Sequence, residues 1–184
     1  IASNRLKNRN TTFVAGDLIN TEALYVTSKL SDYLGGIKVL GDFDTSFEFK
    51  GRSCYVGNGK IEDLEQVKNI VLLGTNPRKE ASVINARIRK AWLNGSNVYR
   101  LGLEENLTYD VKEVGYSFFD LQIVLDKVGA RKSFWSETMF LVGYSFLNAK
   151  SSESALNKVR SLVEKYNSKF LVLHQNASAV GSLD

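Results

Sequence analysis

The sequence of 184 residues contains one cysteine, one histidine and one proline, and each scarcity excludes a kind of site. A single cysteine, Cys54, cannot form an internal disulfide, and an iron–sulfur cluster generally takes four protein ligands. With His174 as the only histidine, a Cys/His zinc site is excluded within this chain as well. Cys54 lies among polar residues that predict a loop, and His174 follows an apolar run. We interpret both as structural, and the sequence predicts neither a metal site nor a catalytic residue.

Long apolar runs and concentrated charge are also missing. No apolar run approaches the roughly 20 residues needed to span a bilayer, so we expect no membrane span. The net charge is +4, and the densest basic group comprises Arg78, Lys79, Arg87, Arg89 and Lys90. This group lacks the interleaved exposed aromatic residues of a nucleic-acid binder. We therefore expect a solvated or subunit-contacting helix face, and no nucleic acid.

The remaining composition is that of a folded α/β protein. Hydrophobic residues make up 43% of the chain and charged residues 24%, which is ordinary for a globular domain. This length can bury a core, so residues 1–184 are expected to form a single domain or part of one. The chain begins with Ile1 instead of Met, which indicates a processed form, an interior fragment or the ordered part of something longer.

Predicted strands alternate with predicted helices. The strands are expected at 12–16, 37–40, 69–73, 98–101 and 139–143, and the helices at 21–34, 61–65, 78–93, 117–128 and 152–166. Residues 41–59 read as a long loop, and residues 169–184 as either a strand followed by a helix or one helix. This alternation predicts an α/β, Rossmann-like fold, with a mostly parallel sheet and helices on both faces.

The most informative segment is the turn Gly74-Thr75-Asn76-Pro77 between a buried strand and a helix. Proline suits the first position of a helix, and glycine permits positive φ or a close approach at the end of the strand. Parallel α/β sheets bind ligands outside the carboxyl ends of their strands, where this turn is expected to lie. The residues after Gly74 match neither a P-loop nor a dinucleotide-binding fingerprint.

The segment from Val71 to Ala81, continuing through 85–91, closely resembles the signature of the largest iron–sulfur subunit (the 75-kDa class) of respiratory complex I. The resembling part of that subunit is its molybdopterin-oxidoreductase-like domain. Weaker matches at 17–24, 107–109, 173–178 and 181–184 extend the resemblance over most of the chain. The cysteine-rich part of the family that carries its iron–sulfur clusters is absent, so the resemblance implies a C-terminal part of the subunit.

The resemblance also implies what the turn has lost. The molybdenum and tungsten enzymes of the superfamily typically follow the G-x-N-P turn with a histidine, and end the next strand in Asp-Pro-Arg. Here Arg78-Lys79-Glu80-Ala81 follows the turn, and the next strand ends Tyr99-Arg100-Leu101-Gly102. The turn residues Gly74, Thr75, Asn76, Pro77 and Arg78 are then a vestigial site with no cofactor. Together with Asn85 and Arg87, they would fix the turn and its docking.

On this resemblance we expect a structural, non-cofactor-binding domain in the peripheral arm of NADH:ubiquinone oxidoreductase. Iron–sulfur clusters and FMN would lie in partner chains. The partners would be the cluster-bearing N-terminal part of the same subunit, the flavoprotein and other peripheral-arm subunits. The location would be the matrix side of the mitochondrial inner membrane, or the cytoplasmic face in a bacterium.

Two alternatives remain at this stage. One is an internal piece of an active molybdopterin oxidoreductase, such as a formate dehydrogenase. The other is a free-standing α/β module that binds a small molecule or nucleotide.

Overall fold

The computed structural model describes residues 11–16, 18–41, 51–103, 106–117, 120, 132–147, 149 and 152–184. The chain divides into two compact units. One is formed by residues 1–44 and 174–184, and the other by residues 45–173. The expectation that residues 1–184 form one domain, or part of one, stays a prediction.

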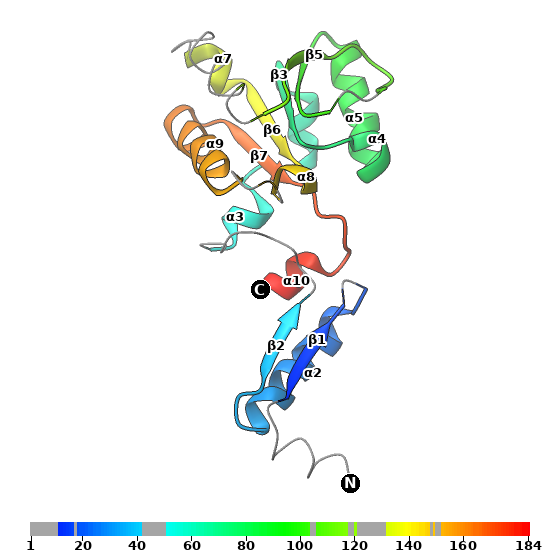
Figure 1. Cartoon of the computed structure of the whole chain (residues 1–184). Coiled ribbons are helices and arrows are strands. Elements are labelled where there is room, and N and C mark those ends of the chain that lie inside the picture. Colours follow the sequence, from blue (N-terminus) through cyan, green and yellow to red (C-terminus); the bar gives the residue numbers. More distant parts are fainter. Residues whose placement is uncertain are drawn as a thin grey trace. The chain divides into compact units, whose positions relative to one another are not determined.

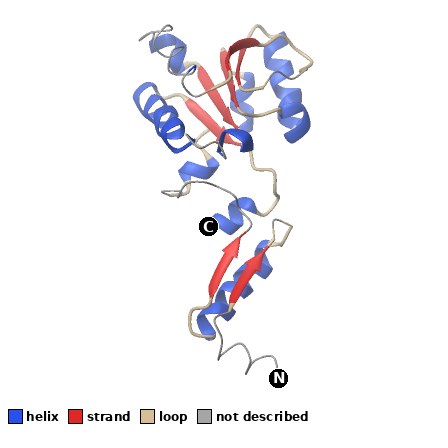
Figure 2. Ribbon diagram, in the orientation of Figure 1, coloured by secondary structure: helices blue, strands red, loops and turns tan. Residues whose placement is uncertain are grey.

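The larger unit is built on a five-stranded parallel sheet (Figures 1 and 2). Its strands are β3 (Asn69–Leu73), β4 (Asn97–Leu101), β5 (Lys112–Gly115), β6 (Thr138–Val142) and β7 (Lys169–Val172). Their order across the sheet is β5-β4-β3-β6-β7. The chain runs outward from central β3 to β5, returns to β6 on the other side of β3, and continues to β7. The direction of winding therefore reverses between β3 and β6, which is the switch point of a doubly wound fold.

Helices cover both faces of this sheet, as predicted (Figure 2). The helices are α3 (Ser53–Val56), η1 (Ile61–Glu65), α4 (Pro77–Glu80), α5 (Ser82–Leu93), α7 (Lys132–Ser136), α8 (Tyr144–Leu147) and α9 (Ser152–Tyr166). Because side chains alternate along a strand, Ile70 and Leu72 pack in a cluster with Ile88 of α5. Val71 and Leu73 lie in the opposite cluster, with Val159 of α9 among its members. The α/β, mostly parallel architecture is thereby confirmed.

The helix predicted after Pro77 is interrupted. Ala81 has φ −150° and ψ 72°, so the chain leaves helical geometry there and divides the segment into α4 and α5. Helix α5 buries an apolar face, on which Ile88 and Ala91 are fully buried. It ends at Leu93, as predicted, and Asn94 is its C-cap.

Short elements were missed by the sequence-based prediction. Helices α3, α7 and α8 and strand β5 were not predicted. The loop expected between 41 and 59 contains α3, and the placement of Cys54 in a polar loop was wrong, since its side chain is buried in that helix. The helix predicted at 117–128 falls mostly outside the described residues. The helix predicted at 152–166 is confirmed as α9.

The outer edge of β7 is covered by the segment after α3. The backbone N–H groups of Asn58 and Gly59 donate to the Phe170 carbonyl. The Asn58 side chain accepts from the Phe170 N–H at 2.8 Å and donates to the Ser168 carbonyl at 3.2 Å. Edge strands present unpaired backbone groups, so this segment satisfies part of an edge that would otherwise be open.

The smaller unit contains β1 (Thr12–Ala15), α2 (Thr21–Tyr33), β2 (Lys38–Gly41) and α10 (Ala179–Leu183). Strands β1 and β2 pair in parallel, and Asn20 caps α2 because its side chain accepts from the Ala23 N–H. The apolar residues Val26 and Leu30 of α2 are 63% and 41% exposed. The ambiguous tail is a strand, β7, followed by a helix, α10. No helix among the described residues is long and apolar enough to cross a membrane.

Candidate functional site

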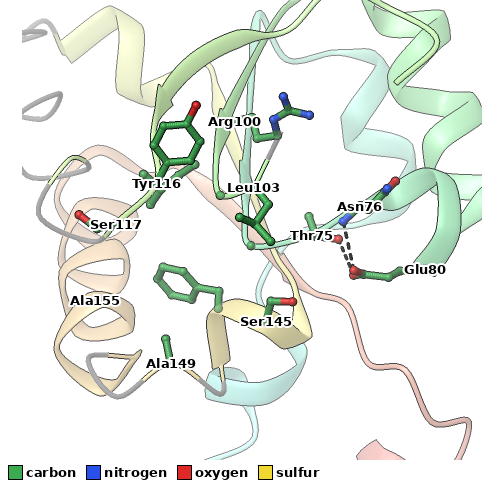
Figure 3. Close-up of a pocket in the computed structure, with 14 residues that line it drawn as sticks. Thr75, Asn76, Glu80, Arg100, Leu103, Tyr116, Ser117, Ser145, Ala149 and Ala155 are labelled. Carbon is green, nitrogen blue, oxygen red and sulfur yellow. Dashed lines mark hydrogen bonds between the residues drawn. The ribbon is translucent and has the colours of Figure 1, made fainter. Parts of the chain in front are cut away.

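A cavity of about 350 Å³ opens at the carboxyl ends of β3, β4, β5 and β6 in the larger unit (Figure 3). This is the switch point of the sheet, where doubly wound folds bind ligands. The volume lies within the range of small-molecule sites. The cavity is lined by Gly74, Thr75, Asn76, Glu80, Arg100, Leu101, Gly102, Leu103, Tyr116, Ser117, Ser145, Phe146, Ala149 and Ala155. We call it the switch-point crevice.

The predicted turn reaches this crevice only in part. Gly74, Thr75 and Asn76 line it, whereas Pro77 and Arg78 are not among the lining residues. The Arg78 side chain is exposed, and its Nη1 donates to the Asn106 carbonyl at 3.2 Å. The five residues predicted as one vestigial site therefore divide into three that line the crevice and two that belong to the start of α4.

Gly74 is constrained in both conformation and space. Its φ is +54°, in the left-handed region that favours glycine. A Cβ added at this position would lie 2.6 Å from the Phe146 backbone nitrogen and 2.8 Å from its Cβ. The expectation of positive φ and a close neighbour at Gly74 is confirmed.

Asn76 begins the helix that follows the turn. It is the N-cap of α4, and its Oδ1 accepts from the Arg78 N–H at 3.1 Å. Pro77 occupies the first helical position, where its missing N–H leaves no donor unsatisfied. Thr75 and Asn76 are both buried, so their polar groups need partners inside the protein.

Glu80 supplies two of those partners, a role that was not predicted from the sequence. The Thr75 hydroxyl donates to Glu80 Oε2 at 2.6 Å, and the Asn76 N–H donates to Glu80 Oε1 at 3.1 Å (Figure 3). A glutamate shortly after an N-cap asparagine could have indicated this contact, since side chains in the first turn often reach back to the cap N–H. The carboxylate thereby occupies two hydrogen-bond donors of the turn.

Arg100 is the cation of the crevice. It lies in β4 with only 4% of its surface exposed. Its Nε donates to Glu113 Oε2 at 3.2 Å, and its Nη2 pairs with Glu113 Oε1. Glu113 is the residue opposite Arg100 on β5. Arg100 and Glu113 also line a second hollow of about 410 Å³, beside Tyr109 and Asp110.

Asn85 and Arg87, two further residues of the signature, make contacts within the larger unit. The Tyr109 hydroxyl donates to Asn85 Oδ1 at 2.8 Å, and burial raises the pKa of Tyr109. Arg87 and Lys90 both bind Glu65 of η1, at 2.7 and 2.6 Å. These cations hold α5 to η1, so the basic helix face predicted for a subunit contact is partly engaged within the chain itself.

Two residues that line the crevice, Tyr116 and Ser117, form a further group of hydrogen bonds. The backbone N–H groups of Tyr116 and Ser117 and the Ser117 hydroxyl donate to Asp120, at 2.7–3.0 Å. These hydrogen bonds lower the pKa of Asp120, and the bond from the Ser117 N–H has the largest effect. Cys54 and His174 are absent from the lining. Among the described residues, no group of three or more His, Cys, Asp or Glu is placed to hold a metal ion.

Comparison with known proteins identifies the family of this chain. A family model described as molybdopterin oxidoreductase matches residues 1–184, the whole chain. The chain belongs to the molybdopterin oxidoreductase family.

Within this family, similar curated proteins are subunits of NADH dehydrogenases. The chain is 32% identical over 183 residues to the NADH-ubiquinone oxidoreductase 78 kDa subunit, mitochondrial, of Candida albicans. It is 28% identical to the 75 kDa subunit of Reclinomonas americana over 198 residues, and to an NADH-quinone oxidoreductase subunit of Rickettsia prowazekii over 185. Each match covers 93% of this chain but only 25–28% of the relative. The chain thus spans about a quarter of the length of these relatives.

A solved structure resembles the fold. The formyltransferase/hydrolase complex from Methylorubrum extorquens, determined with methylofuran, contains a chain that aligns with a TM-score of 0.55 and 15% identity. The alignment covers 94% of this chain and 55% of that one. At this identity the likeness concerns the fold alone.

Proposed function

We propose that this chain is a structural, non-cofactor-binding part of the peripheral arm of NADH:ubiquinone oxidoreductase. The similarity to its 75 and 78 kDa subunits over 93% of the chain supports membership in that complex. NADH oxidation and electron transfer to quinone would then be carried out by other parts of the assembly. The role of this chain is to pack beside them as one domain, or part of one.

The non-binding part of the proposal depends on one observation. The polar groups of the turn and the guanidinium of Arg100 are engaged by the chain's own carboxylates. Glu80 accepts from Thr75 and Asn76, and Glu113 pairs with Arg100. A phosphate-bearing cofactor needs donors and cations that can turn toward it. The crevice residues therefore do not fit such a cofactor, and no reaction step is assigned to one.

The proposed partners follow from the same assignment. They are the cluster-bearing N-terminal part of the subunit, the flavoprotein subunit and other peripheral-arm subunits, which would carry the iron–sulfur clusters and FMN. The relatives include mitochondrial and bacterial proteins. The proposed location is accordingly the matrix side of the mitochondrial inner membrane, or the cytoplasmic face of a bacterial membrane.

An active molybdopterin oxidoreductase, such as a formate dehydrogenase, is the second candidate. The family match over residues 1–184 favours it. Against it are the sequence after the turn, which has Arg78-Lys79-Glu80 and no histidine, and the β4 end Tyr99-Arg100-Leu101 in place of Asp-Pro-Arg. These positions supply the cofactor contacts in such enzymes.

One purification separates the two candidates. The full protein that carries this chain is tagged in its own cells and isolated from membranes in mild detergent. We expect it to co-purify with NADH-oxidising, quinone-reducing subunits and to contain no molybdenum or tungsten by elemental analysis. Stoichiometric molybdenum or tungsten, without NADH-oxidising subunits, would instead establish the second candidate.

A further inference from the structure

The switch-point crevice contains the groups that commonly bind phosphate. The Thr75 hydroxyl and the Asn76 N–H follow β3. Arg100 lines the crevice from the neighbouring strand β4, and its guanidinium is directed to Glu113, beside the second hollow. Backbone N–H groups, hydroxyls and arginine at the carboxyl ends of parallel strands are typical phosphate ligands. Lining residues and space alone would therefore favour an anionic ligand here.

We infer that Glu80 and Glu113 exclude phosphate-bearing ligands from the switch-point crevice by binding its donors themselves. This inference rests on the proposed function, because it explains how a member of this family is closed to the family's kind of cofactor. It goes further by assigning the exclusion to two named carboxylates. Replacing them should restore binding of an anion.

Glu80 acts on the turn. Its two carboxylate oxygens accept from Thr75 at 2.6 Å and from Asn76 at 3.1 Å, so one anionic group already satisfies both donors. An incoming phosphate would have to displace this carboxylate and would then lie beside it. The negative charges of the phosphate and of the Glu80 carboxylate would repel each other, more strongly in a partly desolvated crevice than in water. The competition for the two donors and this repulsion both disfavour binding of an anion.

Glu113 acts on the cation. It faces Arg100 across the β4–β5 pair and contacts both Nε and Nη2. The Arg100 side chain is only 5% exposed, whereas that of Glu113 is 42% exposed. Replacing Glu113 by glutamine removes a negative charge that contacts this buried arginine. An anion that reached Arg100 would then meet less electrostatic competition.

The Glu80 contacts also have a simpler role as a reciprocal cap of α4, like the glutamate of a capping box. The two roles make different predictions. A cap affects only the stability of the fold, whereas an excluding carboxylate also determines what the crevice binds. Glutamine at position 80 keeps an acceptor without the charge, and alanine frees both donors, so the two substitutions separate hydrogen bonding from charge.

The test measures binding of inorganic pyrophosphate by isothermal titration calorimetry, using the full protein at low ionic strength. The variants are Glu80→Ala, Glu80→Gln, Glu113→Gln and the double variant Glu80→Ala/Glu113→Gln. Glu164→Ala is the matched control, because it removes one negative charge from the exposed side of α9, away from the crevice. Circular dichroism verifies that each variant is folded.

We expect no saturable binding by the wild type or by Glu164→Ala. Glu80→Ala should bind saturably, with an affinity at least about tenfold above the upper limit measured for the control, the factor that one charge-assisted hydrogen bond contributes. Glu80→Gln should lie between them, and the double variant should bind most tightly. If the Glu113→Gln variants do not fold, the two position-80 variants still decide the question.

Two results would overturn the inference: wild-type binding equal to that of Glu80→Ala, or folded position-80 variants that bind no better than Glu164→Ala. Neither result would alter whether the protein co-purifies with NADH-oxidising subunits. Conversely, molybdenum or tungsten in the purified protein would contradict the proposed function, whatever affinity for pyrophosphate the titrations give. The two failures are therefore distinguishable.

Discussion

Positions in the larger unit differ in how many side chains they can accept, and Gly74 is among the most restricted. Its positive φ and its contact with Phe146 act together, because any side chain would be both strained and overlapping. Gly95, at the end of α5, has φ +97° but nothing within 4 Å of an added Cβ. This pair separates conformational strain from steric overlap.

We expect Gly74→Val to destabilise the protein by more than about 2 kcal/mol, because strain adds to overlap with a backbone atom. Gly95→Ala should cost only about 1 kcal/mol, from strain alone. Urea unfolding followed by circular dichroism measures both values. Equal losses for the two variants would show that the close approach to Phe146 is not a constraint.

A second residue-scale prediction concerns Asp63 and pH. Hydrogen bonds from the Lys169 side chain, at 2.7 Å, and then from the Lys60 N–H lower the pKa of Asp63 from its ordinary value of 3.8. A carboxyl with a lowered folded-state pKa contributes stability that is present above its unfolded pKa and lost as pH falls through the folded one. The contribution is therefore complete at pH 7.

We expect Asp63→Asn to be less stable than the wild type at pH 7, with a difference that stays constant down to about pH 5 and shrinks below pH 4. Urea unfolding from pH 7 to pH 3 measures the difference. The neighbouring exposed Glu62→Gln serves as the control and should change little at any pH. A difference that grows in acid would contradict the assignment.

Elements that bury a regular apolar pattern were predictable from sequence, and short ones were not. Strands β3 and β6 are continuous buried runs, and helix α9 buries an apolar stripe at helical spacing, and local sequence displays both kinds of pattern. Helices α3, α7 and α8 have four or five residues each, too few to establish a period. Strand β5 is partly exposed, and it is a strand because it pairs with β4. That contact depends on the tertiary structure and is not visible in the local sequence.

One element-scale prediction concerns the segment that covers β7. The side chain of Asn58 bridges two backbone groups beside β7, at Ser168 and Phe170, more than 100 residues away along the chain. Asn58→Ala should cost about 2 kcal/mol, because two hydrogen bonds are lost and their backbone partners are left beside the strand. The exposed Asn157→Ala in α9 should change stability by less than about 0.5 kcal/mol.

Urea unfolding measures the change in unfolding free energy for Asn58→Ala and Asn157→Ala, and hydrogen exchange shows which strand is destabilised. Amide protection should fall in β7 for Asn58→Ala but not for Asn157→Ala. If Asn58→Ala lost stability with unchanged protection in β7, the segment would not act as an edge cover.

At the scale of the whole molecule, the site could be located from the sequence but its chemistry could not. The turn after β3 was predictable because glycine and proline mark it locally, and its position at the carboxyl end of a parallel strand follows from the fold. The partners of Thr75, Asn76 and Arg100 were not predicted. Glu80 contacts the turn from the far end of α4, and Glu113 meets Arg100 only through the β4–β5 register. Such pairings depend on tertiary structure.

The contacts of the basic residues on α5 also depend on the tertiary structure. Arg87 and Lys90 bind Glu65, so charge reversal at Arg87 would disturb the contact of α5 with η1 as well as any interface. A loss of assembly by an Arg87 variant could therefore come from either cause. Arg89 is exposed on the same helix and is the cleaner position for testing the surface.

We expect Arg89→Glu to leave the unfolding free energy within about 0.5 kcal/mol of the wild type and to reduce co-purification with the other subunits. Arginine at an interface can pair bidentately with carboxylates, and reversal would turn that attraction into repulsion. Lys165→Glu, an equal charge change on the exposed side of α9, is the control and should assemble normally. Filter binding near physiological salt should show no retention of DNA or RNA, whose binding would instead depend steeply on salt. Salt-sensitive retention that Arg89→Glu abolishes, together with normal assembly of that variant, would reassign this helix to nucleic acid.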